Sequence, residues 1–268
     1  MPRRSANLQV MIRAVMKAAR NLVRDFGEVE QLQVSMKGPA DFVSAADRKA
    51  ERIIVEELQR MRPEYGFLLE EGGAIKAKDG SSRFLVDPLD GTTNFLHGVP
   101  HFALSVALEQ RGEIVAGCIY DPLKDELFAA DKGDGAFLND RRLRVSGRSD
   151  MGQALIGCGL PVRNWKGREK GFDAQMSAIA DVCGGLRRLG TASLDLAYIA
   201  AGRQDGFWEY GLKPWDIAAG ILIVREAGGR IARLEGDDDL FEEGTILASN
   251  SALYEEFRGI VEARVTKA

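Results

Sequence analysis

Apolar residues near the N-terminus recur at the spacing of an amphipathic helix. They lie three or four residues apart from Leu8 to Phe26 and predict a helix over that span. Residues 2–24 are rich in Arg and contain no acidic residue, a composition that superficially resembles a transit peptide. The regular apolar spacing instead favours a first helix docked on the core. A second helical pattern runs from residue 44 to residue 62 and stops at Pro63.

Downstream of the second helix, the pattern changes to short apolar runs separated by turn residues. Runs at 66–69, 84–87, 103–109, 114–120 and 126–130 predict strands, with a polar loop at 72–82. After residue 146 the two kinds of element alternate, with strands at 154–158, 186–189, 206–209 and 245–248 and helices at 167–181, 192–201, 215–227 and 251–263. We therefore expect an antiparallel-rich α+β half over residues 1–146 and an α/β half over residues 147–268.

The stretch Asp-Pro-Leu-Asp-Gly-Thr-Thr-Asn-Phe at residues 87–95 is the densest group of candidate functional residues. Pro88 has a fixed φ and no amide donor, so it can hold the two flanking aspartates where the chain leaves a strand. Gly91 allows a tight turn, and Thr92 can begin a short helix whose free amides favour an anion. Two carboxylates beside an anion site indicate a divalent metal that holds a phosphate.

Four more carboxylates occur at the ends of predicted elements. Asp47 lies in the first turn of a helix, Glu70 and Glu71 follow a strand, and Asp216 opens a helix. Each one alone would more often be a helix cap or a solvated side chain, but together with residues 87–95 they indicate a site. Oxygen ligands without clustered His or Cys favour Mg²⁺ over zinc, and Mg²⁺ commonly shares phosphate oxygens with a substrate.

Composition and charge narrow this picture only slightly. The net charge is −4, from 36 basic and 40 acidic residues, which gives no general reason to expect nucleic acid as the main ligand. The three Cys are widely spaced and indicate reduced thiols in a cytoplasmic protein. Apolar runs are too short to span a membrane, so no membrane partner is expected.

Three segments of the sequence resemble the inositol monophosphatase family of Mg²⁺-dependent, lithium-sensitive phosphatases. They are residues 87–95, residues 215–220 continuing through 226–229, and residues 37–47 with Glu70-Glu71 downstream. The match extends from about residue 6 to the C-terminus. The resemblance implies the layered α/β sandwich of the inositol monophosphatase and fructose-1,6-bisphosphatase type. It also implies an active site between the two halves and a homodimer.

The resemblance further implies a role for each candidate residue, with two or three Mg²⁺ ions per site. Metal ligands would be Glu70, Asp87 and the carbonyl of Leu89 for one ion, and Asp87, Asp90 and Asp216 for another. Thr92 and Asp47 would help to position the attacking water beside Glu70, and the amides of Gly91 and Thr92 would contact phosphate. Substrate hydroxyls would meet Gly190, Thr191, Ala192 and Glu209, and the substrate would also lie beside Asp90 and Asp216.

The reaction that the resemblance implies is hydrolysis of myo-inositol monophosphate to myo-inositol and phosphate by a metal-activated water. Fructose 1,6-bisphosphate, histidinol phosphate and 3′-phosphoadenosine 5′-phosphate are alternative substrates within the superfamily. Relatives that act on the phosphoadenosine usually carry Lys-Glu at the position of Thr93-Asn94, which argues against that substrate. Other phosphatase classes fit poorly, because the Asp-x-Asp, Walker P-loop and Cys-x5-Arg patterns are absent.

A second hypothesis belongs to another functional class. The chain would act as a regulatory binding partner of the transcription or RNA-processing machinery, with phosphatase activity secondary. Its only support is the basic N-terminal helix and a run of four arginines between Arg141 and Arg148. Without a functional role, that run of arginines would be a solvated loop.

Overall fold

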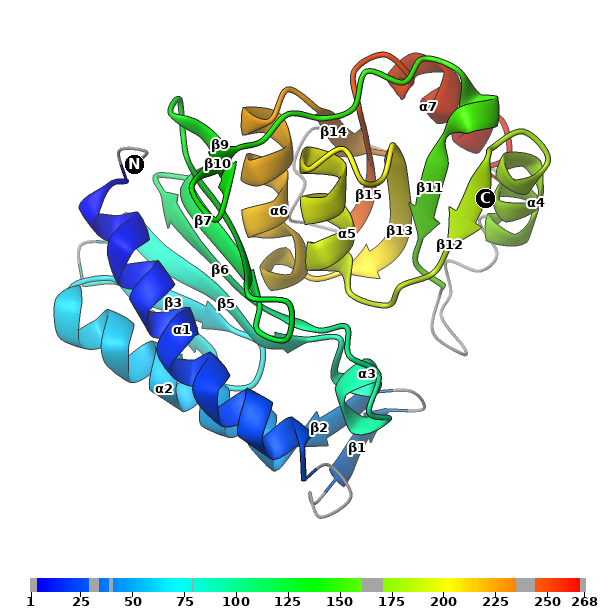
Figure 1. Ribbon diagram of the computed structural model, residues 1–268. Coiled ribbons are helices and arrows are strands. Elements are labelled where there is room, and N and C mark those ends of the chain that lie inside the picture. Colours follow the sequence, from blue (N-terminus) through cyan, green and yellow to red (C-terminus); the bar gives the residue numbers. More distant parts are fainter. Residues whose placement is uncertain are drawn as a thin grey trace.

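The computed structural model describes residues 4–28, 34–38, 41–78, 80–160, 171–234 and 244–265, with the backbone alone at 34–38, 41–44 and 244. Its helices are α1 (Ala6–Phe26), α2 (Ala45–Met61), α3 (Thr92–Leu96), α4 (Phe172–Ala180), α5 (Ala192–Ala200), α6 (Pro214–Glu226) and α7 (Tyr254–Glu262). Helices and sheets alternate in layers (Figure 1). Within the described residues, no helix is long and apolar enough to cross a membrane.

The first sheet has the strand order β10-β9-β8-β7-β6-β5-β3-β4. Its strands are β3 (Gly66–Leu69), β4 (Gly73–Ile75), β5 (Ser82–Asp90), β6 (Ala103–Gln110), β7 (Glu113–Asp121), β8 (Glu126–Asp131), β9 (Gly135–Leu138) and β10 (Arg141–Arg142). Only the β3–β5 pair is parallel. Helices α1 and α2 cover one face, because each has a buried apolar stripe at the predicted spacing. A separate hairpin joins β1 (Val34–Gly38) to β2 (Asp41–Ser44).

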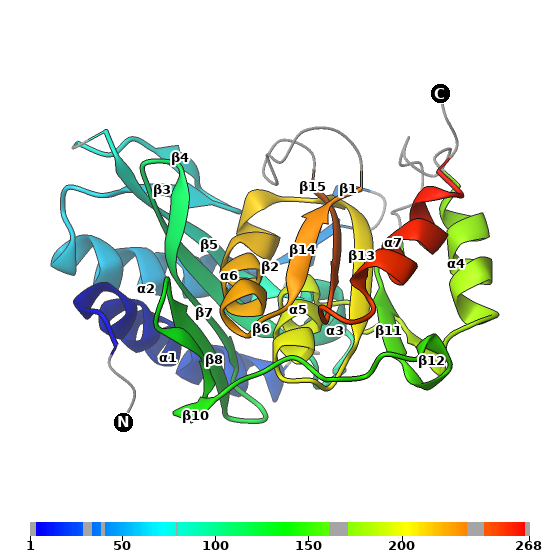
Figure 2. The same ribbon diagram turned by 90° about the horizontal axis from the view of Figure 1, so that it is seen from above.

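The second sheet has the order β12-β11-β13-β15-β14 and mixes parallel and antiparallel pairs. Its strands are β11 (Leu155–Cys158), β12 (Gly185–Arg187), β13 (Gly206–Leu212), β14 (Arg230–Arg233) and β15 (Gly244–Ser249). Helices α5 and α6 form the layer between the two sheets, and α4 and α7 cover the outer face of the second (Figure 2). Apolar residues on nearly every side of α5 and α6 explain this central position.

Most predicted elements are present, and the differences lie where hydrophobicity carries little signal. Strand β4 falls inside the predicted polar loop at 72–82, and all its residues are exposed, so only backbone pairing with β3 defines it. Strand β14 was not predicted, because its Arg-Ile-Ala-Arg sequence offers one fully buried residue. Strand β5 does not end at Asp87 but continues to Asp90 through a shift in its register with β6.

The layered α/β sandwich that the resemblance implied is confirmed, including an antiparallel-rich first sheet. The predicted boundary at residues 146 and 147 falls in the segment that joins the two sheets. Division into two domains stays a prediction. The predicted helix at 167–181 begins outside the described residues, where α4 is observed from Phe172.

Candidate active site

Residues from both halves line one pocket of about 140 Å³. Its lining residues are Glu70, Asp87, Leu89, Asp90, Gly91, Thr92, Arg188, Gly190, Ala192, Glu209, Leu212 and Asp216. The C-terminal end of β5 and the N-terminal ends of α3, α5 and α6 therefore meet here. Helix N-termini carry unpaired amides and a partial positive charge, so this end of the pocket favours an anion.

The register shift in β5 shapes the first part of the pocket. The Asp87 carboxylate accepts a hydrogen bond from the Leu89 amide at 2.9 Å, and the Thr92 hydroxyl donates to the Leu89 carbonyl at 2.9 Å. Gly91 follows with a φ of 90°, and a Cβ there would lie 2.5 Å from the Thr191 hydroxyl oxygen. Both the backbone angle and the lack of space require glycine at this turn.

The carboxylates around Asp87 repel one another. Asp87 is only 2% exposed, and burial raises its pKa well above the usual range. The charges of Glu70, Asp90 and Asp216 raise it further. A bound cation would relieve this repulsion, because it neutralises the buried charges where the chain itself supplies mainly acidic groups.

Asp90 is held by the helix that begins on the opposite side of the pocket. One of its carboxylate oxygens accepts from the Ser193 amide at 2.7 Å and from the Ser193 hydroxyl at 2.5 Å. Burial raises the pKa of Asp90 to about 6, although the hydrogen bonds from Ser193 act in the opposite direction. Ser193 thus joins the two halves, a role that the sequence analysis missed.

Asp216 is fixed by the first turn of α6. Pro214 occupies the first helical position, where its missing amide costs nothing. The Asp216 carboxylate accepts from the Lys213 amide at 2.6 Å. Burial and the charge of Asp90 raise the pKa of Asp216 well above its usual range. The predicted position at a helix start is therefore observed.

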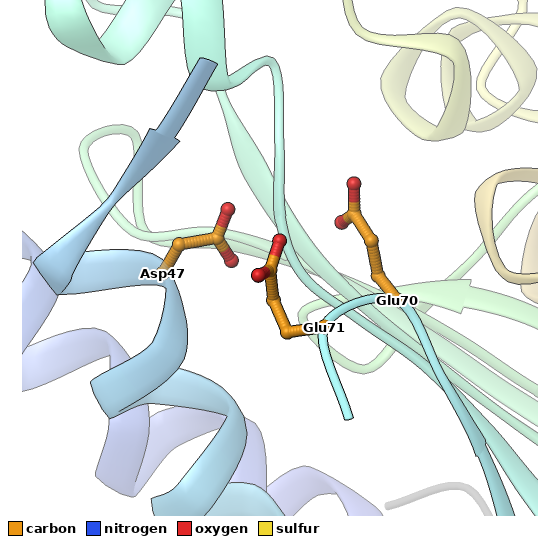
Figure 3. Close-up of side chains that lie close together, drawn as sticks. All are labelled: Asp47, Glu70 and Glu71. Carbon is orange, nitrogen blue, oxygen red and sulfur yellow. The ribbon is translucent and has the colours of Figure 1, made fainter. Parts of the chain in front are cut away.

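A second acidic group lies beside the pocket. Oxygens of Asp47, Glu70 and Glu71 all lie within 4.8 Å of one another, as ligands of one cation would. Figure 3 shows the three side chains, Asp47 at the start of α2 and the two glutamates after β3. The Glu71 amide donates to Glu51 at 2.9 Å, which anchors this turn. Carboxylates in this arrangement fit a hard divalent cation.

The other wall of the pocket comes from the C-terminal half. Gly190, Ala192 and Glu209 line it as predicted, whereas Thr191 does not line this pocket and its hydroxyl donates to the His101 carbonyl at 3.1 Å. Burial and neighbouring acids raise the pKa of Glu209 well above its usual range. Arg188 and Leu212 also line the pocket, and neither was predicted from the sequence. Only the Arg-Arg pair at residues 187–188, just before Gly190, could have suggested the former.

Asn94 joins two segments next to the pocket. Its side-chain amide donates to the carbonyls of His101 and Leu189, each at 2.9 Å. The loop before α5 is thereby fixed to α3. His101 is partly buried, and burial lowers its pKa to about 4, so its ring is neutral at neutral pH.

The two-sheet sandwich, the buried carboxylates and the converging helix N-termini define a pocket that can bind cations and an anionic ester together. The sequence model of the inositol monophosphatase family matches residues 5–266, and the chain belongs to this family of metal-dependent phosphatases. The expected fold, enzyme class and family are thus confirmed.

Individual relatives resemble the chain over almost its full length. An inositol-1-monophosphatase of Mesorhizobium japonicum is 56% identical over 250 residues, which cover 93% of this chain and 94% of that protein. The Nus factor SuhB of Vibrio cholerae is 43% identical and covers 91% of each chain. The crystal structure of the extragenic suppressor protein suhB from Bartonella henselae matches with a TM-score of 0.93 at 53% identity, covering 96% of this chain and 99% of that one.

Proposed function

We propose that this protein is a Mg²⁺-dependent phosphomonoesterase that hydrolyses myo-inositol monophosphate to myo-inositol and phosphate. The observation that carries the proposal is the meeting of Glu70, Asp87, Asp90 and Asp216 in one pocket beside three helix N-termini. The name of the Mesorhizobium japonicum relative supports this substrate.

The donor set is the reason for proposing Mg²⁺. Glu70, Asp87 and the Leu89 carbonyl would hold one ion, and Asp87, Asp90 and Asp216 would hold another. All of these groups are hard oxygen donors in a pocket whose acids repel one another. When bound, such ions lower the pKa of a water molecule and stabilise the charge on a leaving alkoxide. The acidic group of Asp47, Glu70 and Glu71 would accommodate a further ion.

The chain itself would bind and orient the phosphate ester. The amides of Gly91 and Thr92, at the start of α3, would donate to phosphate oxygens and stabilise the charge that grows on them during in-line displacement. Thr92 and Asp47 would orient the attacking water. The Thr92 hydroxyl already donates to the Leu89 carbonyl, so its oxygen is left as an acceptor for a water proton.

The opposite wall suits a polyol leaving group. Glu209 brings a carboxyl group into the pocket, and the backbone at Gly190 and Ala192 lies beside it. Carboxyl oxygens accept hydrogen bonds from hydroxyl groups, and in the ionised form these bonds are stronger than those between neutral partners. A ring that carries several hydroxyls would therefore be held better than a simple alkyl or aryl ester.

A substrate panel tests the proposal. Phosphate release would be measured with Mg²⁺ for myo-inositol 1-phosphate, fructose 1,6-bisphosphate and histidinol phosphate. We expect the largest kcat/KM for the inositol ester. A kcat/KM at least tenfold larger for another ester would overturn the substrate assignment and leave the metal-dependent class intact.

A second candidate is a binding role in transcription, favoured by the name of the Vibrio cholerae relative. In this structure, Arg13, Lys17, Arg20 and Arg24 form an exposed basic side of α1. If a catalytically inactive variant restored wild-type growth to a deletion strain, that result would support this role.

We also propose that the protein forms a homodimer and lies in the cytoplasm. The cytoplasmic location is consistent with its three unpaired thiols.

A further inference from the structure

Gly159 lies next to Glu209 across two paired strands. Strands β11 and β13 are parallel, with Cys158 opposite Trp208, and the Gly159 amide donates to the Trp208 carbonyl at 3.1 Å. The pairing thus continues one residue beyond β11, which places residue 159 beside residue 209. Neighbours at the same level of a parallel pair point to the same face of the sheet.

This face of the second sheet is the one that faces the pocket. Trp208 and Tyr210 belong to the core under α4 and α7, whereas Phe207 belongs to the core around α5 and α6. Because side chains alternate along a strand, Glu209 shares the α5 side with Phe207. This side is where Glu209 lines the pocket.

The carboxyl group of Glu209 occupies the space that a side chain at residue 159 would need. A Cβ on Gly159 would overlap Cδ and both carboxyl oxygens of Glu209. Gly159 is not among the glycines with positive φ, so its backbone conformation alone would accept alanine. The requirement for glycine therefore comes from the Glu209 carboxyl group.

Residue 157, two positions earlier on the same face, repeats this arrangement. A Cβ on Gly157 would lie 2.7 Å from Oε1 of Gln204 and 3.1 Å from Oδ1 of Asp195. The intervening Cys158 points to the opposite core. At residues 157 and 159, the inner face of this strand thus lacks a side chain where a polar side chain from another segment lies against it.

We propose that Gly159 is a positioning residue that determines specificity, because its missing side chain lets the Glu209 carboxyl group reach substrate hydroxyls in the pocket. This inference rests on the proposed hydrolysis of a polyol phosphate. A methyl group at residue 159 would turn Glu209 away from its present position. The carboxylates of β5 and α6 would keep theirs, since none of them is among the nearest atoms to that methyl group.

The test compares Gly159→Ala, Glu209→Ala and the double variant on two esters. Myo-inositol 1-phosphate carries ring hydroxyls, and 4-nitrophenyl phosphate carries none. We expect Gly159→Ala to lower kcat/KM for the inositol ester about 10–100-fold, the range for one hydrogen bond to a charged group, and to change the aryl ester less than about threefold. The double variant should match Glu209→Ala within about twofold.

Equal losses on both esters, or a further tenfold loss when Gly159→Ala is added to Glu209→Ala, would overturn the inference. Gly147→Ala is the matched control, because a Cβ on Gly147 meets nothing within 4 Å. If Gly159→Ala does not fold, the double variant decides. Recovery of the Tm of Glu209→Ala supports the overlap, and continued unfolding refutes it.

The same Tm comparison separates this inference from the proposed function. A wild-type enzyme without activity on the inositol ester would refute the proposed substrate. The Tm values of the four proteins would still show whether residue 159 and Glu209 compete for one space. Additive Tm losses would reject that competition, whichever ester the enzyme hydrolyses.

Discussion

The two walls of the pocket differ in how their acidic groups are placed. The N-terminal wall consists of Glu70, Asp87, Leu89, Asp90, Gly91 and Thr92, and most of it comes from one continuous stretch. The C-terminal wall consists of Arg188, Gly190, Ala192, Glu209, Leu212 and Asp216, which come from separate elements. The first wall is shaped by a local turn, and the second by contacts between distant segments.

This difference suggests a division of labour. Acids of the N-terminal wall repel one another, and bound cations would relieve that repulsion, so that wall would determine whether the reaction occurs. Glu209 on the C-terminal wall lies over a glycine and beside the backbone that would contact the leaving group. Apart from Asp216, which would hold an ion together with Asp87 and Asp90, that wall would determine which ester is hydrolysed.

The largest effect is expected for Asp90→Asn. Loss of one negative charge from the proposed ligand set should lower kcat with Mg²⁺ by about 1,000-fold or more, because metal ions contribute several kcal/mol to transition-state stabilisation. An amide oxygen can still accept one hydrogen bond from Ser193, so the fold should persist. Phosphate release and circular dichroism check both points. Asp181→Asn, at an exposed residue, is the control, and near-full activity of Asp90→Asn would refute the role of the N-terminal wall.

A smaller effect is expected for Ser193→Ala, which removes the link between the two walls. The lost hydrogen bond to Asp90 should lower kcat/KM about 10-fold for both the inositol and the aryl ester, since a metal ligand at residue 90 would act on every substrate. Steady-state kinetics on both esters measure it. The exposed Ser177→Ala serves as the control. A loss confined to the inositol ester would instead assign Ser193 to substrate recognition.

Mg²⁺ should stabilise the protein in a pH-dependent way. The folded pKa of Asp90 is raised from 3.8 to about 6, so its contribution to stability is present below pH 4 and is lost as pH rises through 6. The metal-free protein should therefore be less stable at neutral pH than at pH 5. Mg²⁺ at 100 times its Kd should raise Tm by about 5–10 °C at pH 7.5 and by less than about half of that at pH 5.

Thermal unfolding with Mg²⁺ and with EDTA at both pH values measures this dependence. The Asp90→Asn variant is the control, since it lacks the titration of Asp90 and should show a smaller difference between the two pH values. An equal rise in Tm at both pH values would show that the carboxylates do not bind the ion.

Asp195→Asn, behind the C-terminal wall, should have the smallest effect on turnover of these variants. Its expected effect is on the pH dependence of stability. Burial raises the folded pKa of Asp195 from 3.8 to about 8. Its contribution to stability is complete below about pH 4 and declines as pH rises toward 8. Because asparagine does not titrate, the variant should gain stability relative to wild type by up to about 1.4 kcal/mol per pH unit over that range. Urea unfolding at pH 5 and pH 8 checks this gain, and a constant difference would contradict it.

Most residues of the N-terminal wall could be predicted from the sequence, because they are contiguous and their spacing has a local physical meaning. The position of Asp216 could also be predicted from the sequence, since Pro214 and the following apolar run define a helix start. The role of Ser193 could not be predicted, because its partner Asp90 lies 103 residues away and a serine near a helix start is usually a cap. Gly159 was hidden for a similar reason, since only the packed structure shows which atoms occupy the space beside it.

Asn94 shows a limit of another kind. The dipeptide Thr93-Asn94 was interpreted through the substrates of relatives, whereas the Asn94 side chain here joins α3 to the loop before α5. The exposed strand β4 was missed because its pairing is carried by the backbone alone. The sequence pattern therefore predicted most elements but did not reveal the contacts between them.

We propose above that the carboxylates of the pocket bind Mg²⁺ for hydrolysis of an inositol phosphate. The most direct test is phosphate release from myo-inositol 1-phosphate by the purified protein, first after EDTA treatment and then with Mg²⁺ restored. We expect negligible release without Mg²⁺ and recovery of turnover with it. Equal release under both conditions, or no release with Mg²⁺ from a folded protein, would contradict the claim.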